Sequence, residues 1–276
     1  MTSKLLIPSI LSIALLQACG GGGGGDGGTA PAASSSGSTG GSTGTPASAD
    51  SGSVSASFAA GTSSRYQLVG VGSQTFGRLD TSVQASSGAM TKLSDAVLSG
   101  NSVTKDISGD ASYAMGRWAA GTVTRSSGSE TLSGTDNRAY HYIALNSPAQ
   151  FPTTGTLSCD AGAFTTPTYK SGGSGTSPNT GSASGSATLS FGTGGATVGG
   201  AVNVAASGSA GSATLGTTVS STSSASVTGA YLSGGSGAAV QIGDAGGGAF
   251  LVAASYAATL ANGARYIGVA RFRCAA

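Results

Sequence analysis

Apolar and polar residues alternate with a period of two along most of the chain, which is typical of strands that bury one face. Val54-Ser55-Ala56-Ser57-Phe58 and Ala187-Thr188-Leu189-Ser190-Phe191 show this alternation most clearly. Clusters of glycine and serine separate such segments and indicate turns. No long segment has a convincing helical period. The pattern therefore predicts an all-β protein.

The same alternation predicts further strands in both halves of the chain, and this spacing is typical of an antiparallel sheet or barrel. The candidates are residues 66–71, 74–79, 91–98, 112–118, 122–125, 140–145, 202–204, 227–231, 249–256 and 265–274. The alanine-rich residues 253–261 are also compatible with a short helix. In the last candidate strand Cys274 shares a face with Phe272, and Ile267 and Val269 share the other, so we expect Cys274 to point inward.

The first eighteen residues have a different pattern. Lys4 provides a basic start, residues 5–16 form an apolar run, and Leu16-Gln17-Ala18-Cys19 follows it. The run is shorter than the ~20 residues that a spanning helix needs, and Pro8 interrupts it. A small residue before a cysteine, directly after such a run, is typical of a lipoprotein signal. We therefore expect residues 1–18 to be removed and Cys19 to carry the lipid that attaches the chain to a membrane.

Four regions follow from these patterns. After the signal peptide (1–18), residues 19–52 are rich in glycine, serine and threonine and lack large apolar side chains, so we expect a flexible tether with a reach of roughly 30 Å. Residues 53–150 form a β-rich region that carries most of the charges. Residues 151–276 form a second β region, in which Asp244 is the only charged side chain between Lys170 and Arg265.

The overall charge is low. Charged residues make up 8% of the chain and the formal net charge is +2. This composition offers no broad electrostatic attraction to nucleic acid or to anionic lipid, so we expect no nucleic-acid partner.

Cys159 and Cys274 remain once Cys19 is assigned to the lipid, and an even pair in an exported protein predicts a disulfide. The alternative is two buried free thiols. A structural zinc site is not expected, because two cysteines and the single His141 fall short of four ligands. Cys159 lies near the start of the second region and Cys274 lies in its last candidate strand, and the first and last strands would be neighbours in a closed up-and-down barrel.

Several short motifs together carry a family resemblance. They are Gly116-Arg117-Trp118, His141-Tyr142, Phe151-Pro152-Thr153-Thr154-Gly155-Thr156-Leu157, Pro167-Thr168-Tyr169 and Leu189-Ser190-Phe191-Gly192. In order and spacing they resemble transferrin-binding protein B-like β-barrel surface lipoproteins. The resemblance implies a C-terminal eight-stranded antiparallel β-barrel at 151–276, preceded by a smaller β-rich handle region at 53–150. Gly20 after the lipidated cysteine resembles the pattern of lipoproteins sorted to the outer membrane of Gram-negative bacteria.

The chain also departs from that family. The Tyr231-Leu232-Ser233-Gly234 segment has no acidic residue where the family's barrel hairpin continues into a glutamate, and the Cys159 and Cys274 pair is not a general family feature. The best-known members bind transferrin with a two-lobed chain, whereas this chain has room for one lobe. We therefore take the expected fold and location from the resemblance, but not the binding of transferrin.

Catalytic groups are few. His141 would need a serine and an acid such as Asp136 or Asp160 beside it for a Ser-His-Asp site, and no Gly-x-Ser-x-Gly turn supports one. None of the glycine runs is followed by the Lys-Ser/Thr of a phosphate loop. Arg117 beside Trp118 is compatible with a cation–π binding patch, but a lone tryptophan in a β domain is more often part of the core.

These patterns predict a non-catalytic outer-membrane surface lipoprotein that displays a β-barrel binding module to a protein or small-ligand partner. The alternative is a structural or inhibitory envelope lipoprotein with a closed, packed barrel. The size of the side chains inside the barrel distinguishes the two, because eight strands enclose either packed side chains or one small ligand. We expect a monomer without a cofactor or a metal ion. The sequence does not indicate the ligand-binding residues, nor whether the protein faces the periplasm or the cell surface.

Overall fold

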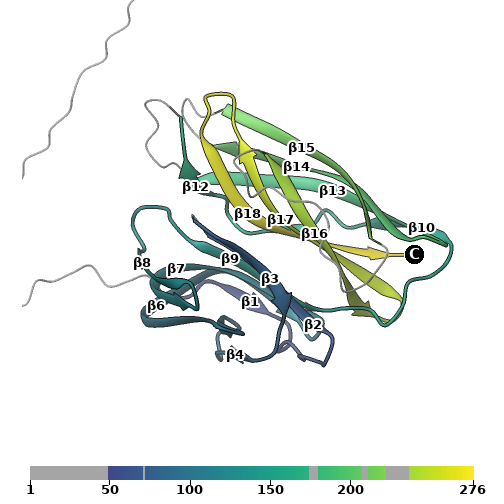
Figure 1. Cartoon of the computed structure of the whole chain (residues 1–276), viewed down its shortest axis with the longest axis horizontal. Helices are drawn as coiled ribbons and strands as arrows, with labels where there is room; N and C mark the ends of the chain where they lie inside the picture. Colours follow the sequence, from purple (N-terminus) through teal and green to yellow (C-terminus); the bar gives the residue numbers. More distant parts are fainter. Residues whose placement is uncertain (1–48, 71, 174–179, 207–210, 222–235) are drawn as a thin grey trace, which may run out of the picture. The chain divides into compact units, whose positions relative to one another are not determined.

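The computed structural model of the chain describes residues 49–276 except 71, 174–179, 207–210 and 222–235, and for residues 211–221 it describes the backbone alone. All regular structure in this part is β-strand, arranged in two largely antiparallel, curled sheets (Figure 1). The all-β prediction is thus confirmed for the described residues. These residues contain no helix that is long and apolar enough to cross a membrane.

The first sheet, called sheet A here, contains the strands of residues 52–146. They are β1 (Gly52–Val54), β2 (Ser64–Val69), β3 (Gln74–Arg78), β4 (Ser82–Gln84), β5 (Met90–Leu93), β6 (Ala96–Asp110), β7 (Tyr113–Arg125), β8 (Gly128–Ser133) and β9 (Tyr140–Asn146). The strand order is β3-β2-β9-β7-β6-β5-β4, with β8 paired to β7 and β1 paired to β6. The β1–β6 pair is parallel.

The second sheet, sheet B, contains the strands of residues 155–275. They are β10 (Gly155–Cys159), β11 (Ala163–Phe164), β12 (Thr168–Ser171), β13 (Gly181–Gly192), β14 (Gly195–Ala206), β15 (Gly211–Ser221), β16 (Gly237–Gly246), β17 (Ala249–Thr259) and β18 (Arg265–Ala275). The strand order is β15-β14-β13-β10-β18-β17-β16, and β11 and β12 continue along β18. The predicted strand 227–231 lies outside the described residues.

Three predictions of strand position are corrected. Residues 91–98 form not one strand but parts of β5 and β6, separated by a tight turn in which Ser94 has a positive φ of 54°. The segments predicted at 112–118 and 122–125 belong to one strand, β7. The strand predicted at 54–58 is wrong beyond Val54, where β1 ends. The alanine-rich residues 253–259 belong to strand β17 and not to a helix.

Strands β17 and β18 bury both faces, and this explains how the two sheets are held together. One face of β17 contributes Val252 and Tyr256 to the core on the inner side of sheet B, together with Cys274 and Phe272 of β18. The opposite face packs into a second cluster shared with sheet A. The members of that shared cluster include Val69, Tyr113, Met115, Ile143 and Leu145 of sheet A and Leu251, Ala253, Ala257, Ile267 and Val269 of sheet B. The predicted division of the last strand into two faces, with Cys274 inward, is confirmed.

Sheet A has a separate apolar core, in which Trp118, Tyr140 and Tyr142 are fully buried.

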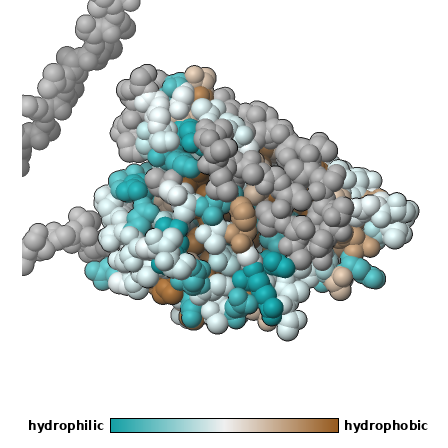
Figure 2. Space-filling view, viewed as in Figure 1, coloured by the Kyte–Doolittle hydropathy of each residue, from teal (hydrophilic) through white to brown (hydrophobic). Residues whose placement is uncertain are grey.

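Outside these cores the surface is weakly polar. The face in Figure 2 is mostly pale or teal with small brown areas, because glycine, serine and threonine dominate the exposed strands. Val83, which is 52% exposed, is the one large apolar side chain exposed in the described part of the chain.

Candidate functional site

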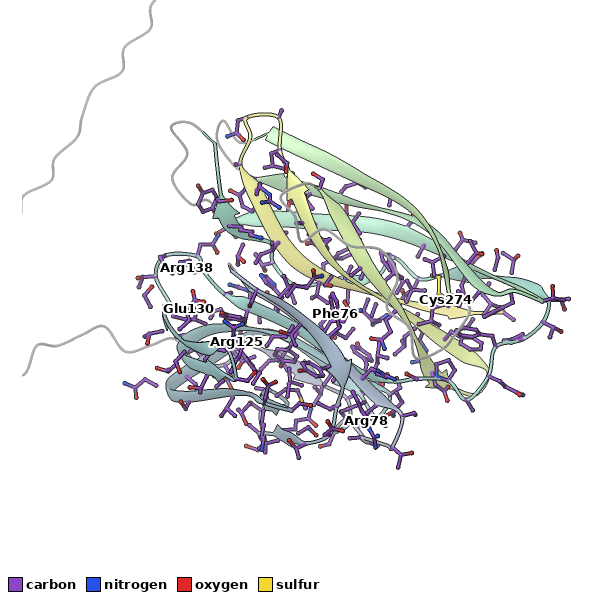
Figure 3. All side chains as sticks on the ribbon, in the orientation of Figure 1. Phe76, Arg78, Arg125, Glu130, Arg138 and Cys274 are labelled. Atoms are coloured by element: carbon purple, nitrogen blue, oxygen red, sulfur yellow. A yellow bond between two sulfur atoms is a disulfide. The ribbon has the colours of Figure 1, made fainter. Side chains whose placement is uncertain are left out.

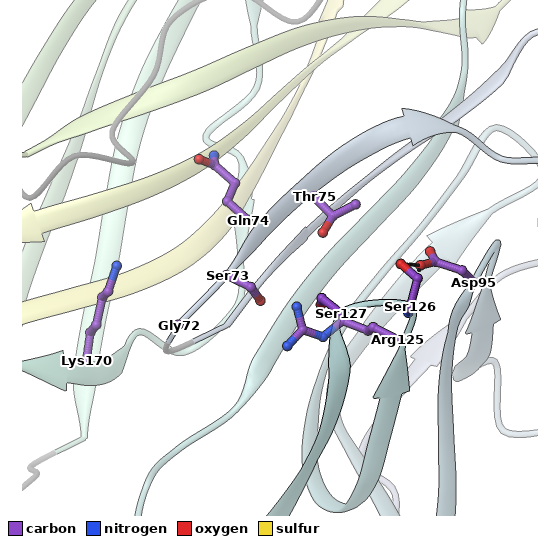
Figure 4. Close-up of a pocket in the computed structure, with 9 residues that line it drawn as sticks. All are labelled: Gly72, Ser73, Gln74, Thr75, Asp95, Arg125, Ser126, Ser127 and Lys170. Carbon is purple, nitrogen blue, oxygen red and sulfur yellow. Dashed lines mark hydrogen bonds between the residues drawn. The ribbon is translucent and has the colours of Figure 1, made fainter.

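A polar cavity with a volume of about 640 Å³ lies where three turns of sheet A approach strand β12 (Figure 4). Every side chain in its wall is polar. The lining residues are Gly72, Ser73, Gln74, Thr75, Asp95, Arg125, Ser126, Ser127 and Lys170. We call this space the Arg125–Lys170 cavity.

The local sequence explains why these side chains meet. Arg125 pairs with Gly128 at the end of the β7–β8 hairpin, so Ser126 and Ser127 form a two-residue turn. Gly128 has a φ of 131°, which glycine adopts without strain. Asp95 occupies the turn between β5 and β6, and Lys170 lies in β12 of sheet B.

Arg125 is held by an aromatic residue and not by a carboxylate. Its Nη2 donates a hydrogen bond to the Tyr140 hydroxyl (3.0 Å), and its guanidinium lies 5.1 Å from the centre of the Tyr140 ring. The Tyr140 hydroxyl donates to Glu130 (2.5 Å), whose other oxygen pairs with Arg138 (2.6 Å). Burial and then the hydrogen bond to Glu130 raise the pKa of Tyr140. Figure 3 shows Arg125, Glu130 and Arg138 near one another at this end of sheet A.

Asp95 is fully engaged by its neighbours. One oxygen accepts the N–H (3.2 Å) and the hydroxyl (2.7 Å) of Ser126, and the other accepts the Tyr66 hydroxyl (3.4 Å). The hydroxyl of Ser126 is the main cause that lowers the pKa of Asp95, so this carboxylate is charged at neutral pH. Burial, followed by the Asp95 charge, raises the pKa of Tyr66 to about 12.

Lys170 has no carboxylate within ion-pair distance among the residues that the structure describes. Partial burial and then the nearby Arg265 cation lower the pKa of Lys170. Both influences disfavour the ammonium form, because burial removes water from the charge and the Arg265 cation repels it. Together with Arg125, Lys170 gives the cavity two cations against the single carboxylate of Asp95.

The structure contains the predicted disulfide. Cys159 of β10 and Cys274 of β18 are register partners on neighbouring strands and are bonded to each other (S–S 1.99 Å). Residues 159 and 274 thus join the first and last strands of sheet B, as the closure argument expects. Cys19, the predicted lipidation site, lies outside the described residues.

His141 is placed between the two sheets and not in a catalytic set. It is fully buried, and its Nδ1 and Nε2 are each 2.7 Å from a threonine hydroxyl, those of Thr165 and Thr168. Both ring nitrogens are therefore occupied, and neither Asp136 nor Asp160 is a partner. Burial is the main cause that lowers the pKa of His141 well below its ordinary value, so the ring is neutral.

Trp118 belongs to the core and not to a binding patch. Its ring is fully buried beside Tyr142 (5.8 Å between ring centres), and its Nε1 donates to the Met90 carbonyl (2.6 Å). Arg117 forms an ion pair with Asp106 (2.9 Å).

Two further cavities bear on function. A polar one of about 230 Å³ is lined by Lys105, Arg117 and Arg138 among others, but Arg117 and Arg138 already pair with carboxylates. An apolar one on the inner face of sheet B has a volume of only about 20 Å³, room for about one water molecule. No group of three or more potential metal-ligating side chains occurs in the described residues.

Sequence reasoning did not identify the Arg125–Lys170 cavity. The available signal was a pair of basic residues, each followed by a turn, in Arg125-Ser126-Ser127-Gly128 and Lys170-Ser171-Gly172-Gly173. That signal shows two charges near turns. It does not show that the turns of sheet A lie beside strand β12 of sheet B.

Comparison of the chain with protein-family models, with curated proteins and with solved structures finds no match in any of the three. The function therefore has to be argued from the chain itself.

Proposed function

We propose that this protein is a non-catalytic outer-membrane surface lipoprotein, anchored through Cys19, that presents a rigid β fold to a soluble partner or ligand. The observation that carries the binding role is the Arg125–Lys170 cavity, an all-polar space formed by three turns of sheet A and strand β12 of sheet B. Because the shared apolar cluster fixes the sheets to each other, the cavity wall is preorganised, which lowers the entropic cost of binding.

We also propose a family for this chain. The chain is a distant, single-lobe relative of transferrin-binding protein B-like lipoproteins, with a handle at 53–150 and an eight-stranded barrel at 151–276. The described strands of sheet B, in which β10 to β12 follow one another along β18, support this assignment.

The anchor is tested by a cysteine substitution. Cys19→Ser should yield an unprocessed or released protein, because only Cys19 stands at the signal motif. Cys159→Ser is the matched control and should stay in the outer-membrane fraction. A Cys19→Ser protein that still fractionates with the membrane through a lipid would contradict the proposal. Protease treatment of intact cells then separates the surface from the periplasmic face.

The binding role is tested with the intact chain as an affinity reagent, offered host fluid and envelope extract separately. Specific retention of a partner from host fluid supports a binding module. Retention from the envelope extract alone supports the second candidate, a structural or inhibitory envelope lipoprotein. Among the described residues, the inner face of sheet B has an apolar cavity with room for about one water molecule, which favours that candidate over a carrier whose ligand lies inside the barrel.

A further inference from the structure

The chemistry of the Arg125–Lys170 cavity narrows the class of ligand that it suits. No apolar or aromatic side chain lines the cavity, so an apolar ligand would gain little by entering it. The hydroxyls of Thr75 and Ser127 can both donate and accept hydrogen bonds. Such a wall matches a ligand that carries many hydroxyl groups.

The charges add a second requirement. Arg125 and Lys170 form no ion pair with any described residue, and the oxygens of Asp95 already accept three hydrogen bonds. The lining therefore carries one net positive charge. A ligand with one anionic group would offset it, and the guanidinium and the ammonium are both suited to carboxylate or phosphate oxygens.

The volume gives the third requirement. About 640 Å³ lies within the range of small-molecule sites and far exceeds the space that an isolated inorganic anion occupies. The cations also come from opposite sides, Arg125 from the β7–β8 hairpin of sheet A and Lys170 from β12 of sheet B (Figure 4). A ligand that contacts both must extend across the cavity.

We infer that the Arg125–Lys170 cavity binds an acidic sugar, a saccharide unit with one carboxylate or phosphate group. The anionic group pairs with the Lys170 ammonium, and the sugar extends across the cavity so that its hydroxyls bond to Arg125, Thr75 and Ser127. This inference rests on the proposed binding role and names its ligand class. The lowered pKa of Lys170 agrees with it, since a bound anion would supply the negative charge that the site lacks.

Calorimetric titration of the intact chain in detergent, with four probes, tests the inference. Glucuronate and glucose 6-phosphate represent the two acidic groups, glucose is the neutral sugar, and inorganic phosphate is the anion without a sugar. We expect at least one acidic sugar to bind ten-fold or more tightly than both glucose and inorganic phosphate. Which of the two binds distinguishes a carboxylate site from a phosphate site.

Matched variants locate the binding. Lys170→Gln removes one cation and should weaken acidic-sugar binding at least ten-fold, and Lys170→Arg should retain binding. Lys92→Gln makes the same charge change on β5, outside the cavity, and should have no effect. Trp118 fluorescence during unfolding checks that all three variants remain folded.

Equal affinity for acidic and neutral sugars, or equal losses in Lys170→Gln and Lys92→Gln, would overturn the inference. Inorganic phosphate binding as tightly as the sugars would also overturn it. If no acidic sugar binds but the affinity experiment still retains a partner, the sugar inference alone fails. If neither binds, the proposed binding role fails as well.

Discussion

At the residue scale, glycines in this glycine-rich protein repeatedly lie opposite tyrosines on the neighbouring strand. Gly116 of β7 faces Tyr142 of β9, and Gly268 of β18 faces Tyr256 of β17. In each pair the tyrosine ring covers the space where a Cβ would be. The large ring replaces the packing that glycine lacks, which is why a strand can contain glycine here without leaving a void.

Adding a methyl group at Gly116 should be destabilising. A Cβ there would lie 2.5 Å from the Tyr142 oxygen, and that ring is held by a hydrogen bond from the Met90 N–H (3.0 Å). We expect Gly116→Ala to cost about 1–3 kcal/mol, the usual range for overpacking a core. Gly199→Ala is the control, because no atom lies within 4 Å of its added Cβ. Urea unfolding followed by Trp118 fluorescence measures both, and equal stabilities of the two variants would contradict the packing argument.

The buried His141 predicts a loss of stability in mild acid. Its folded-state pKa is lowered, mainly by burial, from an ordinary value of 6.5, so the unfolded chain binds a proton that the folded chain does not. The contribution of the neutral ring to the stability of the folded state is complete above pH 6.5. It is lost as the pH falls below 6.5. Stability should therefore decrease as the pH falls below 6.5, with a slope of at most about 1.4 kcal/mol per pH unit.

Because the chain has one histidine, a single substitution isolates this effect. His141→Gln should make stability nearly independent of pH between 6.5 and 4.5, whatever its stability at pH 7. Urea titrations at several pH values measure the slope. A slope that persists in His141→Gln would assign the acid effect to another group.

At the scale of elements, the sequence predicts strands well where large apolar residues alternate with polar ones. β2, β9 and β18 fall close to their predicted positions for this reason. β15 and β16 were not predicted, because glycine, alanine, serine and threonine give little contrast between the two faces. β17 buries both faces, so its alternation is masked, and an alanine-rich run of this kind resembles a helix.

The disulfide could be predicted, whereas the candidate site could not. Pairing of Cys159 with Cys274 follows from strand order alone, because the first and last strands of sheet B are neighbours. The Arg125–Lys170 cavity depends on how β12 of sheet B approaches the turns of sheet A. That arrangement is set by the packing of β17 and β18 against β2 and β9, which the alternation of either sheet alone does not specify.

At the scale of the whole molecule, polar contacts supplement the shared apolar cluster. The Asp106 carboxylate accepts hydrogen bonds from Arg117 of sheet A (2.9 Å) and from the N–H of Thr166 (2.8 Å), in the segment between β11 and β12. The side-chain amide oxygen (Oε1) of Gln67 accepts a hydrogen bond from the Ser255 N–H (3.1 Å) in the buried interface. With these contacts the two sheets are not independent, and we expect them to unfold in one transition.

The disulfide and the single tryptophan make this cooperativity testable, because they lie in different sheets. Cys159–Cys274 closes a span of 115 residues in sheet B, which corresponds to about 4–5 kcal/mol in the chain-entropy treatment. Trp118 lies in the core of sheet A. Reduction should therefore lower the stability reported by Trp118 fluorescence as much as that reported by far-ultraviolet circular dichroism. The double variant Cys159→Ser/Cys274→Ser is the control and should not respond to reductant. If reduction changes the circular dichroism transition and leaves the Trp118 transition where it was, the sheets unfold separately and the shared cluster does not couple them.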